Sequence, residues 1–276
     1  MATDLERIDE ALDRAVAALM PFTPGRIDAQ TKGRDDPVTA ADLAVDAVLR
    51  ATLPRAEEGW LSEETVDDLS RLSRRRVWVV DPIDGTREFV DGIPEWCISV
   101  GLVVDGNPVA GGIHNPATGE RIIGGREFGL TYHGKRPVCV GEQLADARIL
   151  ASRSEVNRGE WHRFAKAGLR VIPTGSVAYK LALVAAGRAD ATWTLVPKNE
   201  WDVAAGAALV AASDGVFGLP NGESRRFNQR DPLLPGFFAC RAELEDEIVA
   251  HFELLQPDLS LGADAARRID SPFNVS

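Results

Sequence analysis

The chain has 276 residues, 45% of them hydrophobic, which is enough to bury a full core in one large domain or in two closely packed halves. Its net charge of −11 argues against binding of a nucleic-acid polymer through general electrostatic attraction. An acidic protein still binds an anionic metabolite when its binding site carries cations.

The cysteines and the N-terminus indicate the compartment. Cys97, Cys139 and Cys240 are widely spaced and form no CxxC pair, which is typical of reduced thiols in a cytoplasmic protein. The N-terminus lacks the cationic start and apolar stretch of a signal peptide, and no run approaches the ~18 apolar residues of a membrane span. We therefore expect a cytoplasmic protein without a membrane partner.

The first third of the chain predicts two helices and a buried strand. Apolar residues recur at helical spacing over 5–19, and a second helical segment covers 38–53. The short run at 60–64 predicts a strand end. The apolar, β-branched run at 77–80 precedes Asp-Pro and Asp-Gly turn signals, which indicates a buried strand that enters a turn.

The remainder changes character twice. Short apolar runs separated by turn signals over 96–140 predict antiparallel hairpins. After about residue 146, predicted strands alternate with predicted helices: strands at 147–152, 170–175 and 190–195, and helices at 176–187 and 201–215. We therefore expect a layered α/β protein with an N-terminal α+β half (1–145) and a C-terminal α/β half (146–276).

The strongest local signal is VVDPIDGTREF, residues 79–89. Asp81 ends the buried strand and Asp84 follows a tight turn, so their carboxylates converge and repel each other unless a cation neutralises them. Magnesium suits such a site because it is hard and prefers oxygen ligands. Gly85 and Thr86 then open a helix whose N–H groups and dipole favour a phosphate. The alternative is a plain strand-to-helix turn in which Asp84 caps the helix.

Other acidic positions have a similar ambiguity. Glu63 and Glu64 precede the Asp81 strand in a βxβ-like order, but adjacent acids are usually a solvated pair. Asp202 begins a helix, where it either caps the helix or completes a metal cluster. Thr39 and Asp42 have the spacing of a capping box, which is sufficient to explain both.

Several polar residues lie at predicted strand ends, where ligands of α/β proteins usually bind: Ser152, Arg153, Ser154, Gly175, Ser176 and Lys198. Each of them taken alone has a structural explanation.

Taken together, these pieces resemble the inositol monophosphatase superfamily of metal-dependent, lithium-sensitive phosphatases. The matching blocks are DPVTAAD (36–42), LSEET (61–65), WVVDPIDGT (78–86), TGSVAYKLALVAAGRAD (174–190) and EWDVAAG (200–206). The resemblance implies a layered αβαβα sandwich like that of fructose-1,6-bisphosphatase. It also implies homodimers, which are usual in the superfamily.

The resemblance further implies a site for two to three Mg²⁺ ions. Glu63, Asp81 and the Ile83 carbonyl would bind one ion, while Asp81, Asp84 and Asp202 would bind a second.

The resemblance implies catalytic roles as well. Gly85 and Thr86 would hold the phosphate, and Thr86, hydrogen-bonded to Asp42, would position the attacking water together with Glu63. Glu64 would support these residues without binding the metal itself. The implied reaction is in-line attack of water on phosphorus without a covalent phosphoenzyme.

Within the superfamily, inositol-specific members carry a glutamate seven residues before the metal-binding aspartate of the WD motif, where this chain has Leu195. Other features, including LSEE, DGTREF and ASRS (151–154), resemble the 3′(2′),5′-bisphosphate nucleotidase branch. We therefore expect hydrolysis of adenosine 3′,5′-bisphosphate to AMP. Lys198, Arg153 or Lys180 would contact its second phosphate, and Gly175 and Ser176 are further candidate substrate contacts.

Two alternatives remain open. One is a phosphatase of inositol monophosphate or of a similar alcohol monophosphate such as histidinol phosphate. The other is a regulatory binding protein of the same fold.

Overall fold

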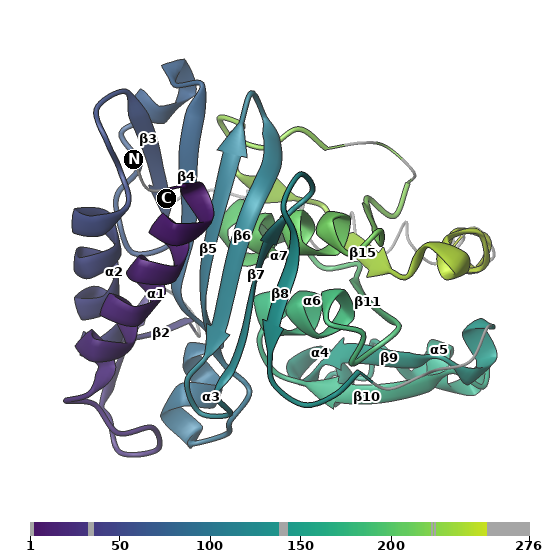
Figure 1. Cartoon of the computed structure of the whole chain (residues 1–276). Coiled ribbons are helices and arrows are strands. Elements are labelled where there is room, and N and C mark those ends of the chain that lie inside the picture. The colour runs from purple at the N-terminus through teal and green to yellow at the C-terminus, as the bar shows by residue number, and fades with distance from the viewer. Residues whose placement is uncertain (1–2, 33–35, 138–142, 222, 224, 253–276) are drawn as a thin grey trace, which may run out of the picture.

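The computed structural model describes residues 3–32, 36–137, 143–221, 223 and 225–252. Helices and sheets alternate in five layers (Figure 1). The first layer holds α1 (Asp4–Leu19) and α2 (Ala40–Thr52), and it covers one face of a six-stranded sheet. Helices α6 (Val177–Ala185) and α7 (Glu200–Ala212) separate that sheet from a five-stranded one. The expected αβαβα sandwich is confirmed.

The larger sheet has the order β3-β4-β5-β6-β7-β8. Its strands are β3 (Glu58–Ser62), β4 (Arg76–Asp84), β5 (Cys97–Val104), β6 (Asn107–Asn115), β7 (Glu120–Gly125) and β8 (Gly129–His133). All neighbours are antiparallel except β3 and β4, which are parallel. The ends of β3 and β4 therefore lie at the same edge of the sheet, and this edge carries the acidic residues.

The smaller sheet has the order β10-β9-β11-β15-β13. Its strands are β9 (Arg148–Ser152), β10 (Arg170–Thr174), β11 (Ala191–Thr194), β13 (Val216–Gly218) and β15 (Phe237–Cys240). The short helices α4 (Arg153–Asn157) and α5 (His162–Lys166) follow β9. Two small ribbons pair β1 (Ala29–Lys32) with β2 (Asp36–Thr39) and β12 (Lys198–Asn199) with β14 (Leu233–Leu234).

Helix α7 packs unusually close to the larger sheet. A Cβ atom on Gly111 of β6 would lie 2.4 Å from the Ala205 carbonyl oxygen, and one on Gly101 of β5 would lie 2.8 Å from the Ala205 nitrogen. Glycine at these two positions lets the helix approach the strands. The beginning of α7, which carries Asp202, is thereby brought toward the edge where β4 ends.

The predicted helices and strands are present, with shifted ends. The strand expected at 77–80 extends through Asp84, because its pairing with β5 resumes at Asp84 after a register shift. The predictions missed both small ribbons and the short helices α4 and α5, because none of these contains enough residues to show a period. Part of the run predicted to end near residue 140, including Cys139, lies outside the described residues.

Candidate active site

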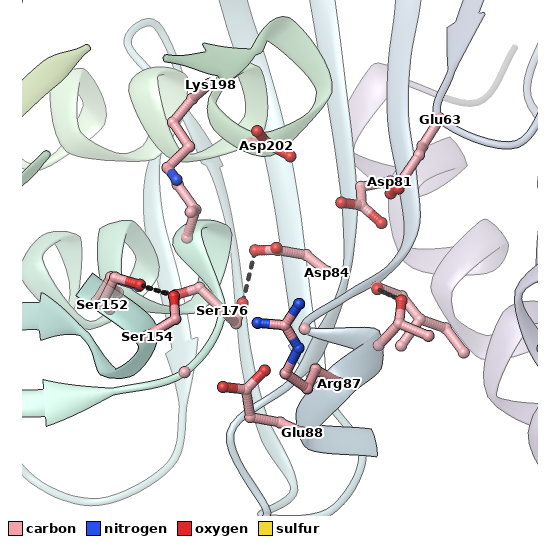
Figure 2. Close-up of a pocket in the computed structure, with 16 residues that line it drawn as sticks. Glu63, Asp81, Asp84, Arg87, Glu88, Ser152, Ser154, Ser176, Lys198 and Asp202 are labelled. Atoms are coloured by element: carbon pink, nitrogen blue, oxygen red, sulfur yellow. Dashed lines mark hydrogen bonds between the residues drawn. The ribbon is translucent and has the colours of Figure 1, made fainter. Parts of the chain in front are cut away.

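One cavity of about 240 Å³ opens between the sheet edge and the beginnings of α6 and α7 (Figure 2). Its lining is mostly polar and comes from both halves of the chain: Glu63, Asp81, Ile83, Asp84, Gly85, Thr86, Arg87, Glu88, Ser152, Ser154, Gly175, Ser176, Val177, Lys180, Lys198 and Asp202. Most of the residues expected at the site therefore meet in one place.

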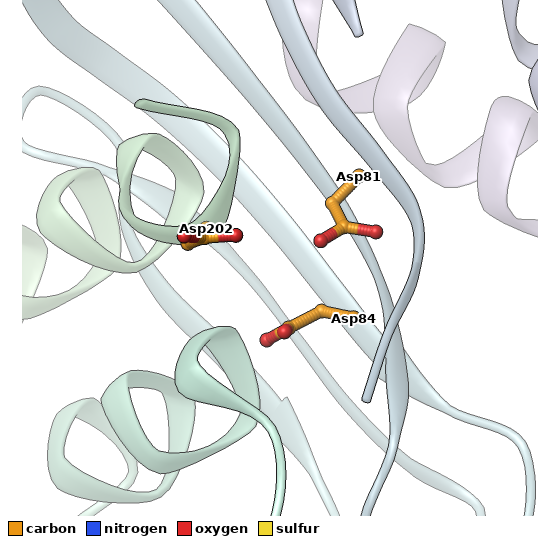
Figure 3. A group of neighbouring side chains, drawn as sticks. All are labelled: Asp81, Asp84 and Asp202. Atoms are coloured by element: carbon orange, nitrogen blue, oxygen red, sulfur yellow. The ribbon is translucent and has the colours of Figure 1, made fainter. Parts of the chain in front are cut away.

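Three aspartates converge at the centre of this cavity. Asp81 and Asp84 come from β4 and Asp202 comes from the first turn of α7, and each contributes a carboxylate oxygen within 4.8 Å of the other two (Figure 3). Glu63, which lines the same cavity directly after β3, lies outside this closest group. The sequence places Asp202 more than 100 residues from the other two acids, and only the fold brings it to them.

The electrostatics of this group favour a cation. Burial raises the pKa of Asp81 well above its usual range, and the charges of Glu63, Asp84 and Asp202 raise it further. The Oδ1 atom of Asp81 is buried and has no hydrogen-bond partner among the described residues. A buried carboxylate oxygen without a donor is costly unless a cation binds it. Hard oxygen ligands at this spacing fit magnesium.

Asp84 does not cap α3 (Thr86–Asp91), so the simple strand-to-helix interpretation is wrong. The N-cap of α3 is Gly85, which makes no side-chain capping bond. The Asp84 carboxylate instead accepts hydrogen bonds from the Ser176 hydroxyl, at 2.6 Å, and from the backbone N–H of Ala178. Burial raises the pKa of Asp84, while these hydrogen bonds and the nearby Lys180 and Lys198 oppose the rise.

Thr86 and Asp42 form the contact that the resemblance implies. The Thr86 hydroxyl lies 3.0 Å from Asp42 Oδ1 and 2.9 Å from the Ile83 carbonyl oxygen, so its proton has two buried acceptors. Asp42 Oδ2 accepts from the backbone N–H and hydroxyl of Thr39, so the capping box is also present. The capping contact and the contact with Thr86 are therefore both present at Asp42.

The turn before α3 depends on glycine. Gly85 has φ +93°, and a Cβ atom there would lie 3.1 Å from the Glu95 carbonyl oxygen. A side chain would be strained in this conformation and would also collide with the chain opposite.

Asp202 also combines two roles. Its Oδ2 atom accepts from the backbone N–H of Asn199 at 2.8 Å, which caps α7, while the side chain faces the other aspartates. Glu64, expected to support the site, is not part of the cavity lining. The turn that carries Glu63 is held by Asp46 of α2, which accepts from Ser62 at 2.5 Å and Thr65 at 2.8 Å.

The opposite side of the cavity carries cations. Lys180 of α6 is almost fully buried, and burial lowers its pKa, whereas Asp84 and Glu155 raise it. Lys198 lies 3.4 Å from Glu155, a buried acid that also accepts from Thr194 at 2.7 Å and from Trp161 at 3.2 Å. Both lysines line the cavity from the C-terminal half, and the Lys180 Nζ donates to the Thr174 and Ser176 carbonyl oxygens.

The remaining substrate candidates are placed differently. Arg153 pairs with Glu95 and does not line the cavity. Gly175 lines the cavity, and its N–H donates to Glu95 at 2.7 Å. The Ser176 hydroxyl also lies in the lining, but it donates to Asp84.

Sequence reasoning did not assign Arg87 and Glu88, which line the cavity from α3. Burial raises the pKa of Glu88. The available signal was their position, because Arg87 and Glu88 lie in the first turn of α3, directly after the acidic motif. Ser152 and Ser154, noted only as strand-end residues, also line the cavity and lie 3.0 Å apart at their hydroxyls.

Comparison with known proteins agrees with this geometry. The model of the inositol monophosphatase family matches residues 4–256. The chain belongs to the inositol monophosphatase family.

Its relatives within this family carry two different activities in their names. An inositol-1-monophosphatase of Mesorhizobium japonicum is 35% identical over 196 residues, which cover 67% of this chain and 72% of that protein. A 3′-phosphoadenosine 5′-phosphate phosphatase of Mycobacterium leprae is 32% identical over 254 residues, or 85% of this chain and 91% of that protein. The solved structure of a Thermotoga maritima inositol monophosphatase (IMPase) superposes with a TM-score of 0.77 at 25% identity, covering 91% of this chain and 96% of that one.

The chain is therefore a metal-dependent phosphatase, and its named relatives act on small phosphorylated compounds. The alternative of a binding protein without catalysis is set aside. In the part of the chain that the structure describes, no helix is long and apolar enough to cross a bilayer.

Proposed function

We propose that this inositol monophosphatase family member is a magnesium-dependent, lithium-sensitive phosphatase that converts adenosine 3′,5′-bisphosphate to AMP. The observation that carries the choice of substrate is that two lysines, Lys180 and Lys198, line the same cavity as the three aspartates. A substrate with two phosphates places one phosphate near the metal-binding aspartates and the other near the lysines. The length of the match to the mycobacterial phosphatase supports the same choice.

In this proposal the metal binds on the acidic side of the cavity, which is the side that carries the carboxylates. Glu63, Asp81, the Ile83 carbonyl, Asp84 and Asp202 are the ligands for two to three magnesium ions. Bound there, magnesium supplies positive charge that acidifies a water molecule and offsets the charge on the leaving oxygen. The unpartnered oxygen of Asp81 and its raised pKa support this assignment.

The chain's own residues position the water and the phosphate. Asp42 and the Ile83 carbonyl accept the proton of the Thr86 hydroxyl, so the lone pairs of that oxygen are left to accept a hydrogen bond from the attacking water on the cavity side. Glu63 holds the same water from the end of β3, with Glu64 as support. The N–H groups of Gly85 and Thr86 bind the phosphate that is removed. The reaction is in-line attack by water, with no covalent phosphoenzyme.

The second phosphate lies on the C-terminal side. Lys198 is the first choice for its contact and Lys180 the second, because both line the cavity and Arg153 does not. The hydroxyls of Ser152 and Ser154 and the backbone of Gly175 complete that side. The proposed division of labour thus gives residues 1–145 most of the metal ligands, and residues 146–276 Asp202 and the substrate contacts.

The runner-up substrate is inositol 1-phosphate or a related alcohol monophosphate such as histidinol phosphate. The name of the Mesorhizobium relative favours it. Against it, Leu195 replaces the acid of inositol-specific members and packs against the apolar core of the C-terminal half. The ring hydroxyls therefore have no carboxylate at that position.

A direct comparison of substrates tests the proposal. Phosphate release from adenosine 3′,5′-bisphosphate, inositol 1-phosphate and histidinol phosphate is measured with and without magnesium, and again with lithium. We expect at least about tenfold higher kcat/KM for the bisphosphate, since a charged hydrogen bond contributes roughly 1.5–3 kcal/mol. A preference for inositol 1-phosphate would leave only the family assignment standing.

We also propose that the protein is a cytoplasmic homodimer. The free, buried thiols of Cys97 and Cys240 support a reducing compartment. Cell fractionation and light scattering of the purified protein test the two statements separately.

A further inference from the structure

Asp84 is held by an element from the other half of the chain. It lies at the end of β4, yet among the described residues its hydrogen-bond donors, Ser176 and Ala178, belong to the beginning of α6. Figure 2 shows the contact with Ser176. The Ser176 hydroxyl donates to Asp84 Oδ2 at 2.6 Å, and the Ala178 N–H donates to the same oxygen. The α6 helix has nine residues, so its N-terminal dipole also favours a carboxylate at this place.

The Ser176 hydroxyl is the centre of this contact. While it donates to Asp84, it accepts the backbone N–H of Tyr179 at 3.0 Å as the N-cap of α6. The buried Cys97 sulfur lies 3.4 Å away on the side of β5. One hydroxyl therefore joins the helix, the metal-binding acid and the larger sheet.

The backbone of Ser176 is held in a strained conformation. Its φ is +59°, a region that residues other than glycine rarely adopt. Lys180 fixes it from inside the helix, since its Nζ atom donates to the Ser176 carbonyl oxygen at 2.5 Å. Glu95 fixes it from outside by accepting the Gly175 N–H. Strain that is held by so many contacts commonly marks a functional position.

We propose that Ser176 is a positioning residue for metal binding, and not a contact for the substrate. It occupies Asp84 Oδ2 and so fixes the orientation of the carboxylate, which contributes one oxygen to the group of three aspartates. Partners of this kind orient a ligand before the metal arrives, and their loss lowers metal affinity about 10- to 100-fold. The inference rests on the proposed ligand role of Asp84.

Two variants separate the effect of the Ser176 hydroxyl from the effect of the strained Ser176 backbone. Ser176→Ala removes the hydroxyl and keeps the unfavourable φ, while Ser176→Gly removes the hydroxyl and relieves the φ. Magnesium binding is measured by calorimetry on the substrate-free protein, at a temperature where melting curves in chelator show each variant folded. We expect both variants to bind magnesium about 10- to 100-fold more weakly than wild type.

Ser154→Ala is the matched control. Ser154 lines the same cavity, but its hydroxyl bonds to Ser152 and to no acid, so we expect wild-type magnesium affinity. In the Ser176 variants, raising the magnesium concentration is expected to restore kcat, which a collapsed site would not permit.

The outcomes distinguish this inference from the proposed function. Wild-type affinity in Ser176→Gly would overturn the inference, because the backbone and not the hydroxyl would then set the site. Unchanged affinity in Ser176→Ala would do the same and leave the metal site intact. Absence of magnesium binding by wild type would instead contradict the proposed function.

Discussion

The two sides of the cavity are built on opposite principles. The N-terminal side places Glu63, Asp81 and Asp84 where the adjacent parallel strands β3 and β4 end, and burial and mutual repulsion of the carboxylates there favour a cation. The C-terminal side places hydroxyls and amino groups around the beginnings of α4, α6 and α7. There the Lys198 charge is already matched by the buried Glu155.

This difference suggests a division between chemistry and selection. The N-terminal side gathers carboxylates that repel one another. We therefore expect its residues to bind the metal and to take part in the reaction. Among the described residues, the hydroxyls of Ser152 and Ser154 bond to each other and Lys198 pairs with Glu155, so these groups can change without removing a contact to the three aspartates. We therefore expect them to distinguish substrates. The predictions that follow test whether the two sides separate in this way.

The largest effect is expected at the centre of the acidic side. Asp81→Asn removes a ligand shared by the proposed ions, so activity should fall below a tenth of wild type at saturating magnesium, measured as phosphate release. In chelator the variant should be folded and slightly more stable, because one of four crowded carboxylates is neutral.

The control is Asp68→Asn, since Asp68 is exposed and remote from the cavity lining. It should match wild type in both measurements. A highly active Asp81→Asn enzyme would remove Asp81 from the chemistry.

The second prediction concerns metal and stability. A ligand that binds only the folded state adds ~2.7 kcal/mol at one hundred times its Kd. For a chain of this size that corresponds to roughly 5–10 °C in melting temperature, at about 2–4 °C per kcal/mol. Thermal melts with increasing magnesium measure the shift.

The shift should be reduced in Asp202→Asn and complete in Lys198→Ala. If Lys198→Ala also lost the magnesium-dependent shift in melting temperature, metal binding would depend on both sides of the cavity. A wild-type melting curve indifferent to millimolar magnesium would argue against the metal site as a whole.

The acidic side could be predicted from sequence because its residues lie within one motif. Asp81, Asp84 and Thr86 are adjacent in the chain, so a strand end and a turn suffice to bring them together. The position of Asp202 at the start of a helix allowed either a cap or a metal ligand, and only the family resemblance favoured the ligand, since its approach depends on the glycines of β5 and β6 that admit α7.

The C-terminal side was predicted less well. Arg153 and Ser176 are correctly placed at strand ends, but sequence does not show which neighbour takes each side chain. Arg153 pairs with Glu95, 58 residues away in the chain. The Ser176 hydroxyl donates to Asp84, 92 residues away. Such long-range partners have no local signal.

The third prediction concerns selection by charge. Lys198→Ala should lower kcat/KM for adenosine 3′,5′-bisphosphate by about tenfold or more, because a charged contact to the second phosphate is lost. For a simple monophosphate the loss should be much smaller. Steady-state kinetics with both substrates at saturating magnesium give the comparison.

Arg153→Ala is the matched control, because it also removes a cation from this side of the fold but from outside the cavity lining. It should leave the ratio of the two substrates unchanged. Equal losses for both substrates in Lys198→Ala would show that Lys198 does not select the substrate.

The smallest effect is expected at the serine hydroxyls. A neutral hydrogen bond contributes about 0.5–1.5 kcal/mol, so Ser154→Ala should raise KM for the bisphosphate by roughly two- to tenfold with little change in kcat. Magnesium affinity should stay at the wild-type value, since the only side-chain partner that the structure gives this hydroxyl is Ser152. Ser176→Ala, one element away, should show the reverse pattern of weakened metal binding with kcat restored by magnesium. If Ser154→Ala weakened metal binding as well, the effect of Ser176→Ala could not be assigned to its hydrogen bond with Asp84, and Ser154 would not belong to the residues that act on the substrate alone.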